Sequence, residues 1–213
     1  MEQKNTFYCQ CNKPRTVCVC DRVQILQTQL KWLVLQHPQE NDHLLGTLPL
    51  LTQSMPQEIK VCVGLSWPSF KHLLGQEVNP KEWFVCFITA EDKQQLSLLD
   101  TQFSNVCFFD KQYQPVESHH VKGIILLDGT WSQAKTLWWR NPWLLKLGRV
   151  RINTQQPSIY GKLRKEPQKY CLSTLETVAA IIETCEPHNH APKQLKTLMR
   201  TMVQRIRDNH EKP

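Results

Sequence analysis

Asp128 is the side chain whose position in this sequence most suggests chemistry. It follows the apolar run at residues 124–127 and is followed at once by Gly129. A glycine permits a tight turn, and Thr130 and Gln133 have the T-x-x-Q spacing of a capping box that starts a helix. A helix cap does not explain a carboxylate at the end of a buried strand. Open α/β sheets bind ligands just beyond the carboxyl ends of their strands, so Asp128 is a candidate active-site residue.

Two other segments could meet Asp128 in one pocket. In the sequence LVLQHPQE, at residues 33–40, a buried strand ends before an extended turn at His37. In the sequence LSTLE, Ser173 and Glu176 have the spacing of a second capping box. A strand-to-helix loop and a helix cap are the simpler interpretations, although a helix amino end also offers N–H groups to a carboxylate.

A cluster of cysteines near the start of the chain has the composition of a metal site. Cys9, Cys11, Cys18 and Cys20 lie within twelve positions, and a turn at residues 12–14 would fold one pair back on the other. Four thiolates can close a tetrahedral zinc site, which would be coordinatively full and therefore structural. The alternative is four unligated thiols.

The positive charge of the chain is concentrated in its second half. The net charge is +7 over 213 residues and the pI is about 9.0. Residues 149–169 contain six basic side chains and one acidic one, and residues 193–207 contain five basic side chains and no acidic one. Such clustering favours an acidic partner, most simply nucleic acid, over an ordinary basic protein.

The cysteine usage and the hydropathy predict a cytoplasmic protein without a membrane segment. No run of 18 apolar residues occurs, and the first residues lack the apolar core of a signal peptide. The nine cysteines are an odd number, which suits a reducing compartment better than a disulfide framework. Five of them lie inside apolar segments: Cys62, Cys86, Cys107, Cys171 and Cys185.

Short apolar runs and helical patterns alternate along the chain and predict an α/β fold. The runs are apolar at consecutive positions, which is typical of parallel strands covered on both faces. Helical spacing follows residues 128, 173 and 194. We therefore expect a mostly parallel sheet flanked by helices over residues 23–213, preceded by a cysteine knuckle at residues 1–22. The predicted strands are 32–35, 59–63, 83–88, 106–109, 123–127 and 150–152.

At this point the motifs become specific enough to suggest a family. The sequence LLDGTW resembles the signature of the DTW-domain proteins, and three further motifs agree in order and spacing. They are the N-terminal cysteines, QHPQE after the first strand, and LRK followed by LSTLE before the penultimate helix. The resemblance covers nearly the whole chain. The first cysteine pair departs from it, since C-x-C replaces the usual C-x-x-C, and Gly46 stands where an asparagine is common.

The resemblance implies an enzyme that modifies tRNA. The family contains tRNA-uridine aminocarboxypropyltransferases, which transfer the 3-amino-3-carboxypropyl group of S-adenosylmethionine to N3 of a uridine and release methylthioadenosine. For a short chain we expect a uridine of the variable loop. The implied fold is similar to that of SPOUT-type enzymes, with a knot in the sheet that cradles the cofactor. Knots are rare in proteins, and the patterns alone would not suggest one.

The resemblance also suggests roles for individual residues. Asp128 would take the proton of uridine N3, or would only orient the uracil or the amino group of the cofactor. An ordinary aspartate is a weak base at neutral pH, and burial beside apolar residues would make it a stronger one. The expected cofactor contacts are main-chain groups of Leu126 and Leu127, side chains of Thr130 and Trp131, and the helix start at Ser173, Thr174 and Glu176. The expected tRNA contacts are His37, Tyr160, Lys162, Arg164 and Lys165.

Two other functions remain open at this stage. A SPOUT-type RNA methyltransferase would use the same cofactor but would release S-adenosylhomocysteine. A non-catalytic RNA-binding protein with a zinc knuckle would show no stabilisation by the cofactor. The carboxylate at the end of a buried strand favours an enzyme over a protein that only binds RNA.

Overall fold

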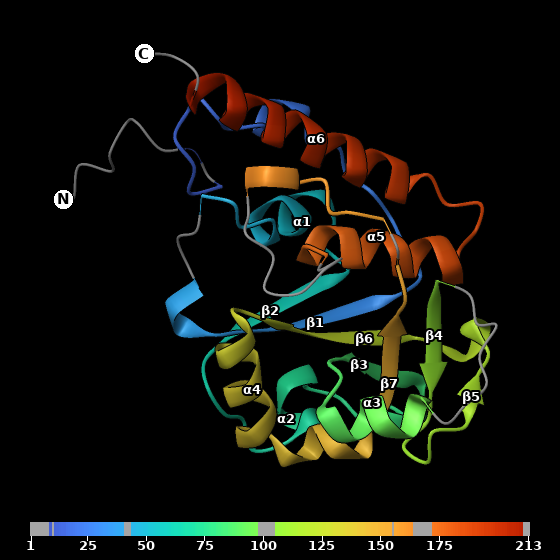
Figure 1. Cartoon of the computed structure of the whole chain (residues 1–213). Helices are drawn as coiled ribbons and strands as arrows, with labels where there is room; N and C mark the ends of the chain where they lie inside the picture. Colours follow the sequence, from blue (N-terminus) through green and yellow to red (C-terminus); the bar gives the residue numbers. More distant parts are fainter. Residues whose placement is uncertain are drawn as a thin grey trace.

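A mixed β-sheet with helices on both faces forms the body of the molecule, as the computed structural model shows (Figure 1). The structure describes residues 9, 11–40, 44–97, 105–154, 156–163 and 172–210. The strands are β1 (Lys31–Gln36), β2 (Ile59–Val63), β3 (Trp83–Cys86), β4 (Val106–Phe109), β5 (Pro115–Val116), β6 (Gly123–Asp128) and β7 (Gly148–Ile152). The helices are α1 (Leu48–Ser54), α2 (Phe70–Leu74), α3 (Ala90–Ser97), α4 (Trp131–Arg140), α5 (Thr174–Cys185) and α6 (Ala191–His210).

The sheet has seven strands in the order β2-β1-β6-β3-β7-β4-β5. The first five strands of this order are parallel, whereas β4 and β5 are antiparallel to their neighbours. The expectation of an α/β fold with a mostly parallel sheet is therefore confirmed. All six predicted strands are present, and the structure adds the short strand β5.

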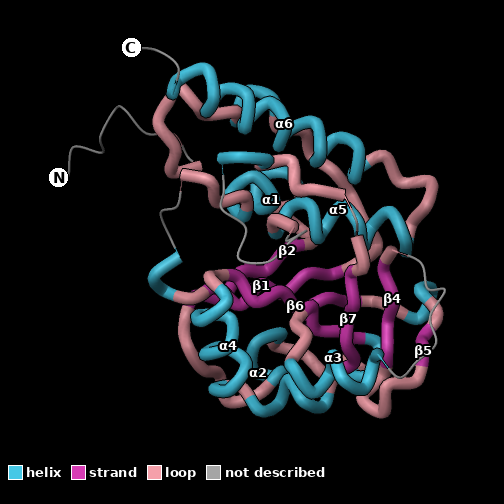
Figure 2. Tube along the Cα trace, in the orientation of Figure 1, coloured by secondary structure: helices cyan, strands magenta, loops and turns pink. Residues whose placement is uncertain are grey.

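Consecutive apolar residues in the strands are explained by two hydrophobic cores, one on each face of the sheet. In β1, Trp32 and Val34 pack into one core, and Leu33 and Leu35 pack into the other, because side chains alternate along a strand. Helices α1, α5 and α6 cover the first face, and α2, α3 and α4 cover the second (Figure 2). Within the described residues, no helix is long and apolar enough to cross a membrane.

The cysteine segment packs as part of the first core. Cys11, Val17, Cys18 and Val19 are buried among residues of α1, α5 and α6. Arg205 of α6 donates hydrogen bonds to both carboxylate oxygens of the neighbouring Asp21. The knuckle is thus anchored to the last helix by apolar packing and by a bidentate ion pair.

The turn after β6 is built for a close approach of the chain. Gly129 has a φ of 154°, and a Cβ at this position would lie 2.9 Å from the Cβ of Gln133. Thr130 and Gln133 form the predicted capping box, with each side chain accepting a hydrogen bond from the other residue's backbone N–H. Helix α4 therefore begins immediately beyond Asp128.

Candidate active site

Three segments that are distant in the sequence meet at the carboxylate of Asp128. Gln36 pairs with Asp128 in the register of β1 and β6, and its side-chain amide donates to Oδ2 at 2.9 Å. The hydroxyl of Thr174, at the start of α5, donates to Oδ1 at 2.9 Å. The backbone N–H of His37 donates to the carbonyl oxygen of Asp128 at 3.0 Å. With only 8% of its surface exposed, Asp128 is held in one orientation.

A pocket of about 350 Å³ opens in front of this carboxylate. That volume lies in the range of small-molecule sites. Its lining includes two carboxylates, Asp128 and Glu40, together with apolar residues such as Leu45, Leu48 and Val61. The lining residues are Cys11, Asn12, Gln36, Glu40, Leu45, Gly46, Thr47, Leu48, Pro49, Thr52, Val61, Val63, Asp128, Gly129, Thr130, Tyr160 and Thr174.

The loop at residues 44–47 forms one side of the pocket and is fixed by hydrogen bonds from distant elements. The amine of Lys13 donates to the carbonyl oxygens of Leu44 and Gly46, at 2.6 and 2.8 Å. The hydroxyl of Tyr160 donates to the carbonyl oxygen of Leu45 between them. Three successive carbonyls of this loop thus each accept a hydrogen bond from a protein donor.

The same loop is joined to the start of α5. The hydroxyl of Thr47 accepts a hydrogen bond from the backbone N–H of Leu175 at 3.2 Å. Ser173 and Glu176 form the predicted capping box, and Glu176 also accepts from the hydroxyl of Ser158 at 2.7 Å. The first turn of α5 therefore joins the loop, the segment near residue 158 and the carboxylate of Asp128.

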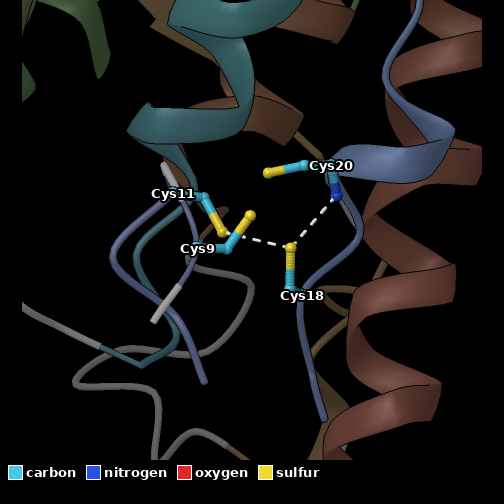
Figure 3. Close-up of side chains that lie close together, drawn as sticks. All are labelled: Cys9, Cys11, Cys18 and Cys20. Atoms are coloured by element: carbon cyan, nitrogen blue, oxygen red, sulfur yellow. Dashed lines mark hydrogen bonds between the residues drawn. The ribbon is translucent and has the colours of Figure 1, made fainter. Parts of the chain in front are cut away.

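The four cysteine side chains converge on a common point (Figure 3). Their sulfur atoms all lie within 4.8 Å of one another, and the Sγ atoms of Cys11 and Cys18 are 3.7 Å apart. A tetrahedral zinc ion with Zn–S bonds of about 2.3 Å holds its sulfurs about 3.8 Å apart. The turn at Asn12, with a φ of 55°, brings the two pairs together as predicted. The cluster can hold a metal ion.

The thiols of this cluster are strongly influenced by burial. Burial is the main cause that raises the pKa of Cys18 to about 11; hydrogen bonds with Cys20 oppose this shift, whereas those with Cys9 and Cys11 add to it. Burial and the neighbouring thiols also raise the pKa of Cys20. A cation at the centre would counter this preference for neutral thiols. The chemistry of the donors, like their spacing, suits a soft metal ion.

The structure brings some of the predicted cofactor contacts to the pocket and places others away from it. Thr130 and Thr174 line the pocket, whereas Leu126 and Leu127 lie farther back in β6 and do not. Trp131, an expected cofactor contact, is 42% exposed on the outside of α4 and does not line the pocket.

The start of α5 contributes to the wall of the pocket mainly through Thr174. Ser173 and Glu176 are buried, and the backbone N–H groups of Ser173, Leu175 and Glu176 already donate to protein acceptors. These amides are therefore engaged within the protein. The expectation that the helix start binds a carboxylate gains no support from this arrangement.

The predicted tRNA contacts are only partly described. Tyr160 is 1% exposed and lines the pocket, so its ring is not an outer surface for stacking. His37 is half-buried, and its Nδ1 accepts from the backbone N–H of Gln39. Lys162 belongs to a short 3-10 helix, Gly161–Leu163, but its side chain is not described. Arg164 and Lys165 lie outside the described residues.

Several residues of the site were not predicted from the sequence. The sequence indicated Gln36 only as the last residue of a strand, yet its side-chain amide donates a hydrogen bond to the Asp128 carboxylate. Thr47 and Lys13 were assigned no role. A polar residue ending an otherwise apolar strand was the available signal for Gln36, while the role of Lys13 depends on contacts more than thirty residues away.

Comparison with known proteins identifies relatives over most of the chain. The family model described as DTW domain matches residues 6–207. The tRNA-uridine aminocarboxypropyltransferase 2 of Macaca fascicularis is 29% identical over 190 residues, which cover 87% of this chain and 58% of the relative. The protein of the same name from Mus musculus is 30% identical over 184 residues, covering 84% of this chain and 56% of the relative.

A plant relative covers more of its own length. The tRNA-uridine aminocarboxypropyltransferase A of Arabidopsis thaliana is 23% identical over 218 aligned positions, covering 95% of this chain and 81% of the relative. The matched part of this chain spans only a little over half the length of the macaque and mouse relatives, 58% and 56%. No solved structure matches the chain.

Proposed function

Because the chain belongs to the DTW domain family, we propose that it is a tRNA-uridine aminocarboxypropyltransferase. The proposed donor is S-adenosylmethionine, and the proposed acceptor is N3 of a uridine in the variable loop of a tRNA. The observation that carries the proposal is the carboxylate of Asp128, fixed by Gln36 and Thr174 inside a pocket of about 350 Å³.

The pocket suits the two halves of this donor. Its carboxylates, Asp128 and Glu40, are complementary to the ammonium and sulfonium charges of the donor. Apolar surface for the adenine base of the donor is provided by Leu45, Leu48 and Val61. When bound, the donor supplies an electrophilic carbon next to its sulfonium.

The proposed step forms a bond between uridine N3 and the γ-carbon of the aminocarboxypropyl group. The bond from this carbon to sulfur breaks, and its electron pair neutralises the sulfonium in methylthioadenosine. The proton of N3 passes to Asp128, the buried carboxylate of the pocket. Gln36 and Thr174 keep the carboxylate facing the reacting atoms, since placement determines which of the activated carbons reacts.

The partners and the compartment follow from the same proposal. Basic side chains at residues 162, 164 and 165 are proposed contacts for tRNA phosphates, as the charge of this segment suggests. A cytoplasmic location is consistent with free thiols at Cys62, Cys86 and Cys185.

Zinc is the proposed ion for the cysteine knuckle, with Cys9, Cys11, Cys18 and Cys20 as ligands and a structural role.

The proposed fold relation is to SPOUT-type enzymes with a knotted sheet. The position of β6 between β1 and β3 supports it, because a strand that comes later in the chain lies between two earlier ones.

Mass spectrometry of unmodified tRNA incubated with the full chain and S-adenosylmethionine tests the function. We expect an aminocarboxypropyl adduct on a uridine and an equal amount of methylthioadenosine. A methyl adduct with S-adenosylhomocysteine would identify an RNA methyltransferase instead. Stabilisation of the protein by tRNA but not by S-adenosylmethionine, without any adduct, would indicate an RNA-binding protein.

A further inference from the structure

Helix α4 carries two tryptophans that the fold leaves on the surface. Trp131 is 42% exposed and Trp139 is 73% exposed, and Lys135 lies between them on the exposed side. Residues four positions apart are neighbours along one side of a helix, so the three side chains form a continuous stripe. We call Trp131, Lys135 and Trp139 the α4 stripe.

The core does not require the exposed tryptophans of this stripe. The adjacent Trp138 is only 4% exposed and fills the core beneath α4, where its ring lies against Phe87 and Arg149. Trp131 touches this layer at one edge, with its ring centroid 6.4 Å from that of Phe87. Trp139 therefore presents a large ring to solvent, whereas the ring of Trp131 lies partly against Phe87. Exposed aromatic side chains that lie together along one side of a helix are typical of an interaction site.

The charge around the stripe determines the kind of partner. Residues 129–146, which comprise α4 and the segments that flank it, contain three lysines and arginines and no aspartate or glutamate. Lys135, Arg140 and Lys146 are exposed on α4 and in the turn that follows it. Aromatic rings interleaved with cationic side chains are complementary to unpaired bases and phosphates. This composition fits a nucleic acid better than an apolar protein surface.

We propose that the α4 stripe, with Arg140, is a docking surface for the substrate tRNA. Unpaired bases stack on Trp131 and Trp139, and Lys135 and Arg140 contact phosphates. The position fits this role, because Thr130 lines the pocket and caps the helix that carries the stripe. A helix of ten residues extends this surface about 15 Å from the pocket. The inference rests on the proposed function, since it assumes that tRNA is the substrate.

Binding of unmodified tRNA to the full chain, without S-adenosylmethionine, tests the stripe. Trp139→Leu keeps an apolar side chain but removes the stacking ring, and we expect about a tenfold rise in Kd for tRNA. Trp139→Phe should restore most of the affinity, because it restores a ring. Lys135→Gln should weaken binding and reduce the salt dependence by about one phosphate contact.

Two controls separate docking from misfolding and from failure of the proposed reaction. Ile25→Ala alters an equally exposed apolar residue on another segment, 69% exposed, and should leave the Kd unchanged. Thermal stabilisation by S-adenosylmethionine should be the same in Trp139→Leu and the wild type. A wild type that binds tRNA through the stripe but transfers nothing would contradict the reaction and retain the docking surface.

Unchanged tRNA affinity in both Trp139→Leu and Lys135→Gln would overturn the proposal. Sedimentation of the same variants covers the other candidate occupant, a second copy of the chain. If the wild type is a dimer, Trp139→Leu is a monomer and tRNA affinity is unchanged, then the stripe is an interface between copies and the proposal is wrong.

Discussion

Each carboxylate oxygen of Asp128 accepts one hydrogen bond from the protein, from Gln36 at Oδ2 and from Thr174 at Oδ1. A carboxylate has about four acceptor positions, so both oxygens retain acceptor capacity for a ligand. Under the proposed function, this carboxylate either takes the N3 proton or only orients the uracil, and the two roles differ in what an asparagine could replace. An asparagine at position 128 can still accept the hydrogen bond from Gln36 through its amide oxygen, but it cannot act as a general base toward N3.

Asp128→Asn therefore distinguishes a general base from an orienting group. If Asp128 is the base, we expect single-turnover transfer to fall by about 10²- to 10⁴-fold, the usual contribution of general base catalysis. Binding of S-adenosylmethionine, measured by calorimetry, should change much less. Glu40→Gln is the control for loss of a negative charge in the same pocket. A rate for Asp128→Asn within about tenfold of wild type would assign Asp128 an orienting role.

Thr174 is expected to act through Asp128, as a positioning residue. Thr174→Val has nearly the same shape but lacks the donor, and a hydrogen bond to a charged group contributes about 1.5–3 kcal/mol. We expect kcat to fall by about tenfold or more, with KM for S-adenosylmethionine changed less. Thr52→Val is the matched control, because Thr52 lines the pocket but donates to the carbonyl oxygen of Pro49. Equal losses in the two variants would contradict the positioning role.

At the scale of the element, local patterns predicted the secondary structure well. Capping boxes at Thr130 and Ser173 marked the starts of α4 and α5, because the spacing of a cap is a local property. Consecutive apolar residues marked the strands for a similar reason. The sequence suggested that the segment at residues 33–40 could meet Asp128, but the hydrogen bond from Gln36 to its carboxylate could not be predicted. This contact depends on β6 lying beside β1, and strand order is determined by packing across the whole chain.

The hydrogen bonds that fix the 44–47 loop could not be predicted from the sequence either. Its sequence contains a glycine and a threonine but nothing that indicates which donors its carbonyls find. Lys13 reaches it from the cysteine turn and is 1% exposed, which is unusual for a lysine. Burial is the main cause that lowers the pKa of Lys13, and the neighbouring cysteines oppose this shift. The loop therefore depends on the knuckle for its conformation.

Lys13→Met should loosen this wall of the pocket while keeping the volume of the side chain. The carbonyls of Leu44 and Gly46 would lose their donor, and we expect KM for S-adenosylmethionine to rise about tenfold with kcat changed less. Lys13→Arg should recover part of the affinity. Lys111→Met, at an exposed lysine elsewhere, is the control. Metal content measured on the same samples should stay constant, and a loss of metal would assign Lys13 to the knuckle instead.

At the scale of the whole molecule, the cysteine knuckle is part of the architecture that holds the pocket. Its residues pack in the core shared by α1, α5 and α6, and Arg205 of α6 pairs with Asp21 at 2.9 and 3.0 Å. Cys11 and Asn12 also line the pocket. Release of a bound metal should therefore affect both the stability of the fold and the binding of the donor.

Removal of the metal tests this coupling. Cys18→Ser should reduce the metal content from about one zinc ion per chain to a small fraction, since a structural site needs its four ligands. We expect Tm to fall by several degrees or more, because each kcal/mol shifts the Tm of a domain of this size by about 2–4 °C. Cys185→Ser is the control, because this half-buried thiol lies on α5 outside the cluster. If Cys18→Ser retains both the Tm and the donor affinity of the wild type, the knuckle does not support the pocket.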